Sequence, residues 1–134
     1  DQKKDIKKIN HFDKNYIRIF KLFLNSRYLW GGKTIEGIDC SALIQIYFYY
    51  NGVLFPRDTR DQIKFIKKSI KKKFSKGDII FWKGHVGACI DQSKFIHAYG
   101  PRKKVTIMPI NHTIKLIKKT ANLIVKKVSN IENY

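Results

Sequence analysis

The sequence predicts an α+β domain in which helices pack on an antiparallel sheet of about five strands. In the first half of the 134 residues, apolar side chains recur at helical spacing. In the second half, short runs of β-branched and aromatic residues alternate with turn residues. A hydrophobic content of 43% is enough for one core, and the length fits one domain.

Two or three helices are expected in the first half. Asp13 is a suitable N-cap for the first, which ends before Asn25. The second follows Asp39, also a good N-cap, and ends at the stop signal of residues 51–52. It is apolar nearly all round, so we expect it to be buried. A shorter helical pattern covers residues 62–66.

The expected strands follow a turn at residues 76–78. They cover residues 79–82, 85–90, 95–99, 105–110 and 123–128.

The two ends of the chain differ in expected organisation. Residues 1–12 are rich in lysine and are interpreted as a linker or arm, and residues 13–134 as the folded domain. Because the chain begins with Asp1, we expect it to be a processed chain or a fragment with an additional upstream domain. No run approaches the roughly 20 apolar residues of a bilayer span.

The formal charge of +18 raises the question of a polyanionic partner. The lysines are spread over the chain without a recognisable nucleic-acid motif, and only five of the 28 basic residues are Arg, the residue that predominates in phosphate and base recognition. We therefore expect no nucleic-acid partner. A basic module that binds anionic polymers without catalysis stays open as an alternative.

Cys40 is the first candidate for chemistry. It lies between a glycine-rich turn and the buried helix, so its thiol is expected in the first helical turn. Backbone N–H groups and the helix dipole stabilise a thiolate there, which predicts a lowered pKa. A buried cysteine is more often inert, so the interpretation depends on a base elsewhere.

Two histidines supply that base. If residues 85–99 form a hairpin that turns near Gln92, then His85, Gly87 and His97 share one face of the sheet. The two rings are then diagonal neighbours within reach of each other. One imidazole can take the proton from a thiol while a second polar group orients it. We assign His85 as the base and His97 as the orienting residue.

A structural zinc site is the rival interpretation of Cys40, His85, Cys89 and His97. Within one strand, His85 and Cys89 would lie about 13 Å apart, too far to share a tetrahedral ion. We therefore expect no metal and no cofactor. Cys89 is interpreted as a core residue, and His11 and His112 as surface residues.

Six separated motifs then match a known family. In order they read Y-L-W-G-G, D-C-S-A-L, P-R-D-T, K-G-D-I-I-F-W, H-V-G and F-I-H-A. Over residues 13–128 the chain resembles the NlpC-type papain-like cysteine peptidases of bacterial cell walls. Ala42 departs from the pattern, because glycine is usual at that position, and the approach to the base through residues 83–84 is short.

The resemblance implies a papain-like fold with Cys40 as nucleophile, His85 as base and His97 as third member. It implies that the Tyr28 hydroxyl helps to bind the substrate carbonyl or oxyanion. Further positions match residues that line the substrate groove of related enzymes. These are Asp39, Ser41, Arg57 and Asp58.

The implied reaction is hydrolysis of the γ-D-glutamyl bond to a diamino acid, most simply diaminopimelate, in peptidoglycan-derived peptides. The P-R-D motif resembles the branch that acts on small fragments with a free amino terminus. That motif and the lack of obligate disulfides favour the cytoplasm over the periplasm or envelope. An amidase or acyltransferase on the same scaffold is the alternative within the enzyme class.

Overall fold

The computed structural model describes residues 16–34, 37–50, 52–69 and 73–132. The predicted arm at residues 1–12, the predicted N-cap Asp13 and His11 lie outside these ranges. The described elements, in chain order, are α2 (Tyr16–Leu22), β1 (Lys33–Thr34), β2 (Gly37–Ile38), α3 (Cys40–Tyr50), α4 (Thr59–Phe65), β3 (Asp78–Trp82), β4 (His85–Cys89), β5 (Lys94–Tyr99), a 3-10 turn (Gly100–Arg102), β6 (Lys104–Pro109), α5 (Ile110–Ala121) and β7 (Lys127–Asn130).

Five of the strands form one antiparallel sheet in the order β6-β5-β4-β3-β7. Short turns connect β3 to β4, β4 to β5 and β5 to β6, so each of these pairs is a hairpin. β7 returns to pair with β3. The predicted α+β class and the predicted five-stranded antiparallel sheet are confirmed.

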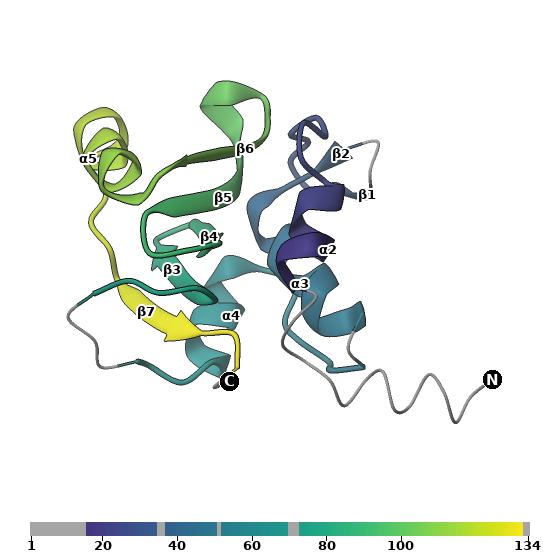
Figure 1. Cartoon of the computed structure of the whole chain (residues 1–134). Helices are drawn as coiled ribbons and strands as arrows, with labels where there is room; N and C mark the ends of the chain where they lie inside the picture. The colour runs from purple at the N-terminus through teal and green to yellow at the C-terminus, as the bar shows by residue number, and fades with distance from the viewer. Residues whose placement is uncertain (1–15, 35–36, 51, 70–72, 133–134) are drawn as a thin grey trace.

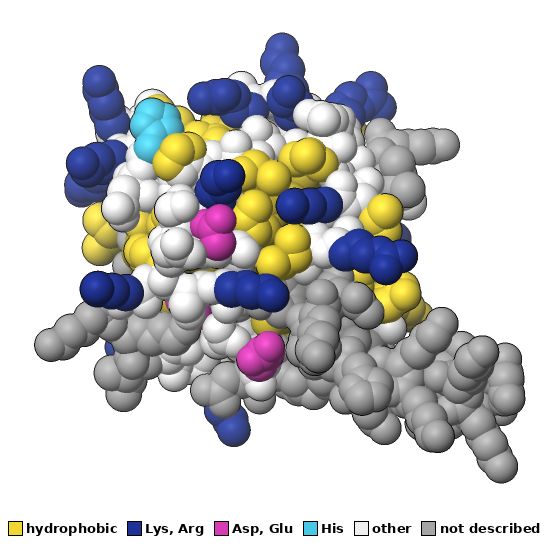
Figure 2. Space-filling model, viewed as in Figure 1, with side chains coloured by type: hydrophobic (Ala, Val, Ile, Leu, Met, Phe, Trp, Pro, Cys, Tyr) yellow, Lys and Arg dark blue, Asp and Glu magenta, His cyan; other side chains and the backbone are white. Residues whose placement is uncertain are grey.

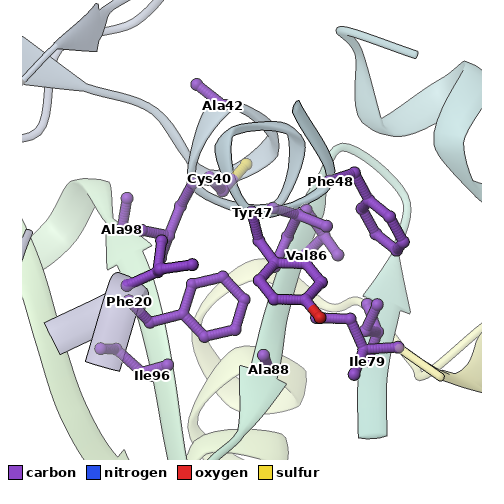
Figure 3. Close-up of a cluster of buried hydrophobic side chains, with 14 of the residues drawn as sticks. Phe20, Cys40, Ala42, Tyr47, Phe48, Ile79, Val86, Ala88, Ile96 and Ala98 are labelled. Carbon is purple, nitrogen blue, oxygen red and sulfur yellow. The ribbon is translucent and has the colours of Figure 1, made fainter. Parts of the chain in front are cut away.

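Helices cover both faces of this sheet (Figure 1). Alternate side chains of a strand point to opposite faces, so β3, β4, β5 and β6 each contribute to two cores. Figure 3 shows part of the core under α3, with Phe20 and Tyr47 packed near Val86 and Ala88. The core on the α5 side includes Ile80, Trp82, Cys89, Phe95, Tyr99, Met108, Ile110 and Ile117.

The predicted buried helix is α3, which begins at Cys40 directly after Asp39. Its buried side chains lie on more than one side because the helix fits between the sheet, α2 and α4. Leu43, Ile44, Tyr47 and Phe48 are fully buried. The expectation of a central helix is confirmed.

Helix α5 was not expected from the sequence. It occupies residues between two predicted strands, where isoleucine and threonine obscure the helical period. Ile110, Thr113 and Ile117 are nevertheless spaced to face the sheet, and all three are buried. Asn122 ends the helix in the left-handed conformation, with φ of 56°.

The last predicted strand is misplaced. It was expected at residues 123–128, whereas β7 is Lys127–Asn130. Residues 122–126 instead connect α5 back to the sheet. An apolar run alone could not distinguish this connection from a strand, because the strand is recognised by its pairing with β3.

The glycine-rich segment before α3 contains a small hairpin. β1 pairs with β2, and Tyr28 forms an isolated parallel bridge with Ile38. A Cβ on Gly32 would lie 2.4 Å from the carbonyl oxygen of Gly37, so this close backbone approach requires glycine. Among the described helices, none has both the length and the apolarity of a bilayer span.

Candidate active site

Asp39 caps the N-terminus of α3. Its Oδ1 accepts a hydrogen bond from the Ala42 N–H at 2.9 Å, as an N-cap side chain does. Oδ1 also accepts from the Ser41 hydroxyl at 3.3 Å, and Oδ2 from the Gly31 N–H at 3.0 Å. The predicted N-cap is confirmed, and the same carboxylate connects the helix to the glycine-rich turn.

Arg57 forms a bidentate ion pair with Asp39. Its Nη1 and Nη2 each lie 3.0 Å from a carboxylate oxygen, and Nη1 also donates to the Ser41 Oγ at 2.9 Å. This geometry is the strong form of an Arg–carboxylate contact. The guanidinium therefore fixes the loop before α4 to the first turn of α3.

Cys40 lies at this helix start, and the residue is 6% exposed. Its sulfur is 3.8 Å from the carbonyl oxygen of Gly84 and 3.9 Å from the hydroxyl of Thr59. The Val86 N–H also hydrogen-bonds to the sulfur. Because Gly84 and Val86 flank His85 in the chain, the sulfur lies against the backbone that carries the predicted base.

The expectation of a lowered thiol pKa is wrong for this arrangement. Burial raises the pKa of Cys40, and the negative charge of Asp39 raises it further. Hydrogen bonds from Val86, Thr59 and Ser41 lower the pKa but do not outweigh burial. The sequence indicated the helix start, whereas the burial of the sulfur is a property of the packed structure.

His85 and His97 form a direct pair. The His85 Nε2 is 2.8 Å from the His97 Nδ1, so the predicted proximity of the rings is confirmed. A Cβ on Gly87 would lie 2.3 Å from Phe95 Cζ and 2.8 Å from His97 Cβ, so only glycine leaves room here. The His97 Nε2 in turn lies 3.2 Å from the Met108 sulfur.

Burial keeps both imidazoles neutral. It lowers the pKa of the half-buried His85 to about 4. For His97, which is fully buried, burial first and then the charges of His85 and Arg102 lower the pKa to about 2. At neutral pH both rings are therefore unprotonated, and each neutral imidazole has a lone pair that can accept a proton.

A pocket of about 420 Å³ opens beside the thiol. Of the eight predicted site residues, all of them described, six line the pocket and His85 and His97 do not. The six are Tyr28, Asp39, Cys40, Ser41, Arg57 and Asp58. His85 directly follows Gly84, another lining residue, so the backbone of His85 lies next to the pocket.

Tyr28 is half-buried at the pocket wall. Burial, followed by the charges of Cys40 and Asp39, raises the pKa of its phenol. The hydroxyl therefore stays protonated at neutral pH and can donate a hydrogen bond into the pocket.

Two residues at this site had no predicted functional role. Thr59 places its hydroxyl near the thiol, and its position in the P-R-D-T motif is the only signal in the sequence. The fully buried Gln62 donates to the carbonyl oxygens of Ser41 and Pro56 at 2.9 and 2.8 Å. It thereby joins α4 to the helix that carries Cys40.

The other predicted assignments concern residues outside the pocket. Cys89 is fully buried in the core on the α5 side, as expected, and His112 is exposed, as expected. Within the part of the chain that the structure describes, no group of three or more His, Cys, Asp or Glu residues could hold a metal ion.

Comparisons with known proteins agree on one family. The model of the NlpC/P60 family matches residues 25–123. A dipeptidyl-peptidase 6 of Lysinibacillus sphaericus is 36% identical over 88 residues, which are 65% of this chain and 32% of the relative. A gamma-D-glutamyl-L-lysine dipeptidyl-peptidase of Bacillus subtilis is 35% identical over 100 residues, 69% of this chain and 34% of the relative.

A solved structure gives the same result. The NlpC/P60 family protein of Bacillus cereus is 31% identical, with a TM-score of 0.66 over 72% of this chain and 34% of that one. The chain thus spans about a third of the length of these proteins. The matched range contains Cys40, His85 and His97 within the papain-like fold described above, and the chain belongs to the NlpC/P60 family.

Proposed function

We propose that this chain is a cysteine peptidase that hydrolyses peptidoglycan-derived peptides at the bond between γ-D-glutamate and a diamino acid. The name of the Bacillus subtilis relative supports this class of bond. The nucleophile would be Cys40, with His85 as base and His97 as the third member of the triad.

One observation carries the proposal. The thiol at the start of α3 lies against the backbone on both sides of His85, and His85 is hydrogen-bonded to a second buried imidazole. A nucleophile, a base and an orienting group in this order are the components of a catalytic triad. The fold alone would not support the proposed peptidase function, because proteins with the same fold can have many different functions.

The perturbed pKa values favour a resting pair of neutral thiol and neutral imidazole. As the Cys40 sulfur attacks the amide carbonyl, His85 takes the thiol proton and then gives it to the leaving amine. Water, with His85 as base, next hydrolyses the thioester and restores the thiol. The protonated Tyr28 hydroxyl and the backbone N–H groups at the start of α3 would stabilise the oxyanion.

The pocket walls support a small charged substrate. Asp58 is exposed at the pocket, and its carboxylate suits a free amino terminus. Arg57 and Ser41 are bonded to Asp39 and to each other. We therefore assign this trio to the shape of the groove, and Asp58 to direct contact with the substrate.

The test uses two tripeptides, L-Ala-γ-D-Glu-diaminopimelate and L-Ala-γ-D-Glu-L-Lys. We expect release of the free diamino acid from at least one of them, measured by chromatography. Cys40→Ala should reduce the rate at least 10⁴-fold, because the nucleophile is lost. Cys89→Ala is the matched control, since this cysteine lies in the core on the α5 side, and its rate should stay within about twofold.

The outcomes separate the alternatives. Cleavage at another amide bond, or acyl transfer to an added amine, that still requires Cys40 would replace the proposed substrate with that of an amidase or acyltransferase. Absence of any cleavage, together with salt-sensitive binding to an anionic polymer, would favour the binding module.

A further inference from the structure

We propose that Met108 is a positioning residue that fixes which nitrogen of His85 carries the proton. Met108 lies on β6, is 4% exposed, and is paired with Phe95 of β5 in the sheet register. Its sulfur is 3.2 Å from the Nε2 of His97, whose Nδ1 is 2.8 Å from the Nε2 of His85. These contacts form a chain from Met108 through His97 to His85.

The direction of the hydrogen bonds follows from the sulfur. A thioether has no hydrogen to donate and is a weak acceptor, so the His97 Nε2 must carry the proton and donate it to Met108. A neutral imidazole has one N–H group. The His97 Nδ1 is therefore the acceptor, and the His85 Nε2 must donate to it.

This arrangement determines the state of Nδ1, the other ring nitrogen of His85. Because Nε2 carries the proton of the neutral ring, Nδ1 keeps its lone pair and can act as the base. In the opposite arrangement, with His97 Nδ1 as donor, His85 would carry its proton on Nδ1 and could not accept another. Met108 thus selects the tautomer of His85 that the reaction requires, and it acts through His97.

This selection requires a neutral His97, because a protonated ring would donate from both nitrogens. The groups around it favour neutrality. The ring of Tyr99 stacks on it at 4.6 Å between centroids, Phe95 packs against it, and the positive charge of Arg102 disfavours protonation. Burial, His85 and Arg102 all lower the pKa of His97.

The sequence offers a direct experiment, since Met108 is the only methionine in the 134 residues. Norleucine in place of methionine exchanges the sulfur for a methylene at this one position of the chain. Selenomethionine is the matched control because selenium retains the acceptor. The readout is the ¹⁵N NMR spectrum of the histidine side chains, in which protonated and unprotonated ring nitrogens have different chemical shifts.

In the methionine and selenomethionine proteins we expect both His85 and His97 to carry the proton on Nε2. In the norleucine protein and in Met108→Leu, His97 loses its acceptor, and a second set of signals with protonated Nδ1 should appear. A lost weak hydrogen bond should change the tautomer ratio by a few-fold to about tenfold. If both rings keep the proton on Nε2 without the sulfur, the proposal is overturned.

The kinetic measurement rests on the proposed function. In peptide hydrolysis, norleucine at position 108 should lower kcat about threefold to tenfold with KM unchanged. Met108 is buried in the core on the α5 side, so its sulfur affects the reaction only through His97 and His85. A changed tautomer ratio with unchanged kcat would support the positioning role and contradict His85 as base. Thermal unfolding of the same samples confirms that the comparison is made on folded protein.

Discussion

On the face of the sheet under α3, the strands present apolar side chains such as Phe81, Val86 and Ile96. On the face under α5, the same strands present His85 and His97 among aromatic rings. Neighbouring residues of one strand therefore have different tasks. The first face holds α3 in place, and the second holds the imidazole pair.

The two faces also differ in how much change they tolerate. An apolar contact loses energy in proportion to the volume removed, and its neighbours relax in part. The imidazole pair depends on two hydrogen bonds of fixed length and direction. We therefore expect substitutions under α3 to change stability, and substitutions under α5 that move the imidazole pair to change activity as well.

Among substitutions that compare the two faces, the largest effect is expected at Gly87 of β4. In Gly87→Ala, the new methyl group would meet Phe95 and the Cβ of His97 at distances that require movement. Because His97 must shift, we expect a loss of about 100-fold in kcat/KM, measured with the tripeptide, in addition to lower stability.

Ala88→Gly is the control for this variant, since Ala88 faces α3. It removes one buried methyl group, and we expect about 1 kcal/mol lower stability in urea unfolding with activity per folded molecule unchanged. Equal losses of activity in both variants would contradict the division between the faces.

The sequence allowed prediction of the hairpin and the histidine pair because a strand repeats every two residues. Once residues 85–99 were assigned to a hairpin, the common face of His85, Gly87 and His97 followed. Cys40 was predicted in the same way from Asp39 and the apolar run after it. These features depend on residues close together in the chain.

Other features depend on distant residues and could not be predicted from the spacing of residues along the chain. The contact of Thr59 with the thiol joins segments 19 residues apart, and the burial that raises the pKa of Cys40 comes from the packing of several elements. Helix α5 was missed because its β-branched residues resemble a strand, and its amphipathic pattern has meaning only against the sheet that it covers.

A smaller loss of activity is expected from a substitution in α4 beside the Cys40 thiol. Thr59→Val removes the hydroxyl near the sulfur and keeps the side-chain shape. The hydroxyl lowers the pKa of Cys40, so its loss should raise this pKa further and lower kcat/KM about threefold to tenfold. Thr59→Ser, which retains the hydroxyl, should restore most of the activity.

The rate of alkylation of Cys40 by iodoacetamide against pH measures the same effect. Because burial raises the pKa of this thiol, we expect the midpoint above that of an ordinary cysteine, and higher still in Thr59→Val. Peptide mapping separates Cys40 from Cys89. A midpoint well below the ordinary value would indicate a thiolate–imidazolium pair and contradict the neutral resting state.

The smallest expected effect is a change of stability with pH, which we expect for the α5 face of the sheet and not for the α3 face. The pKa of the fully buried His97 is lowered to about 2, whereas in the unfolded chain it is about 6.5. As the pH falls below about 6.5, the unfolded chain binds a proton that the native chain does not bind, so stability is lost. From pH 6.5 to 5.5, His97 alone should remove about 1 kcal/mol, and the lowered pKa of His85 acts in the same direction.

Urea unfolding at pH 7.5, 6.5 and 5.5 tests this with two adjacent residues of β5. His97→Gln removes one of the two titrating imidazoles on the α5 face, so stability should depend less on pH in this range. Ile96→Val on the α3 face should lower stability by about 0.5–1.5 kcal/mol equally at all three pH values, because no titrating group is changed. If the pH dependence of His97→Gln equals that of the unmodified chain, His97 is not the buried neutral imidazole on which both the hydrogen-bond chain to Met108 and the proposed base depend.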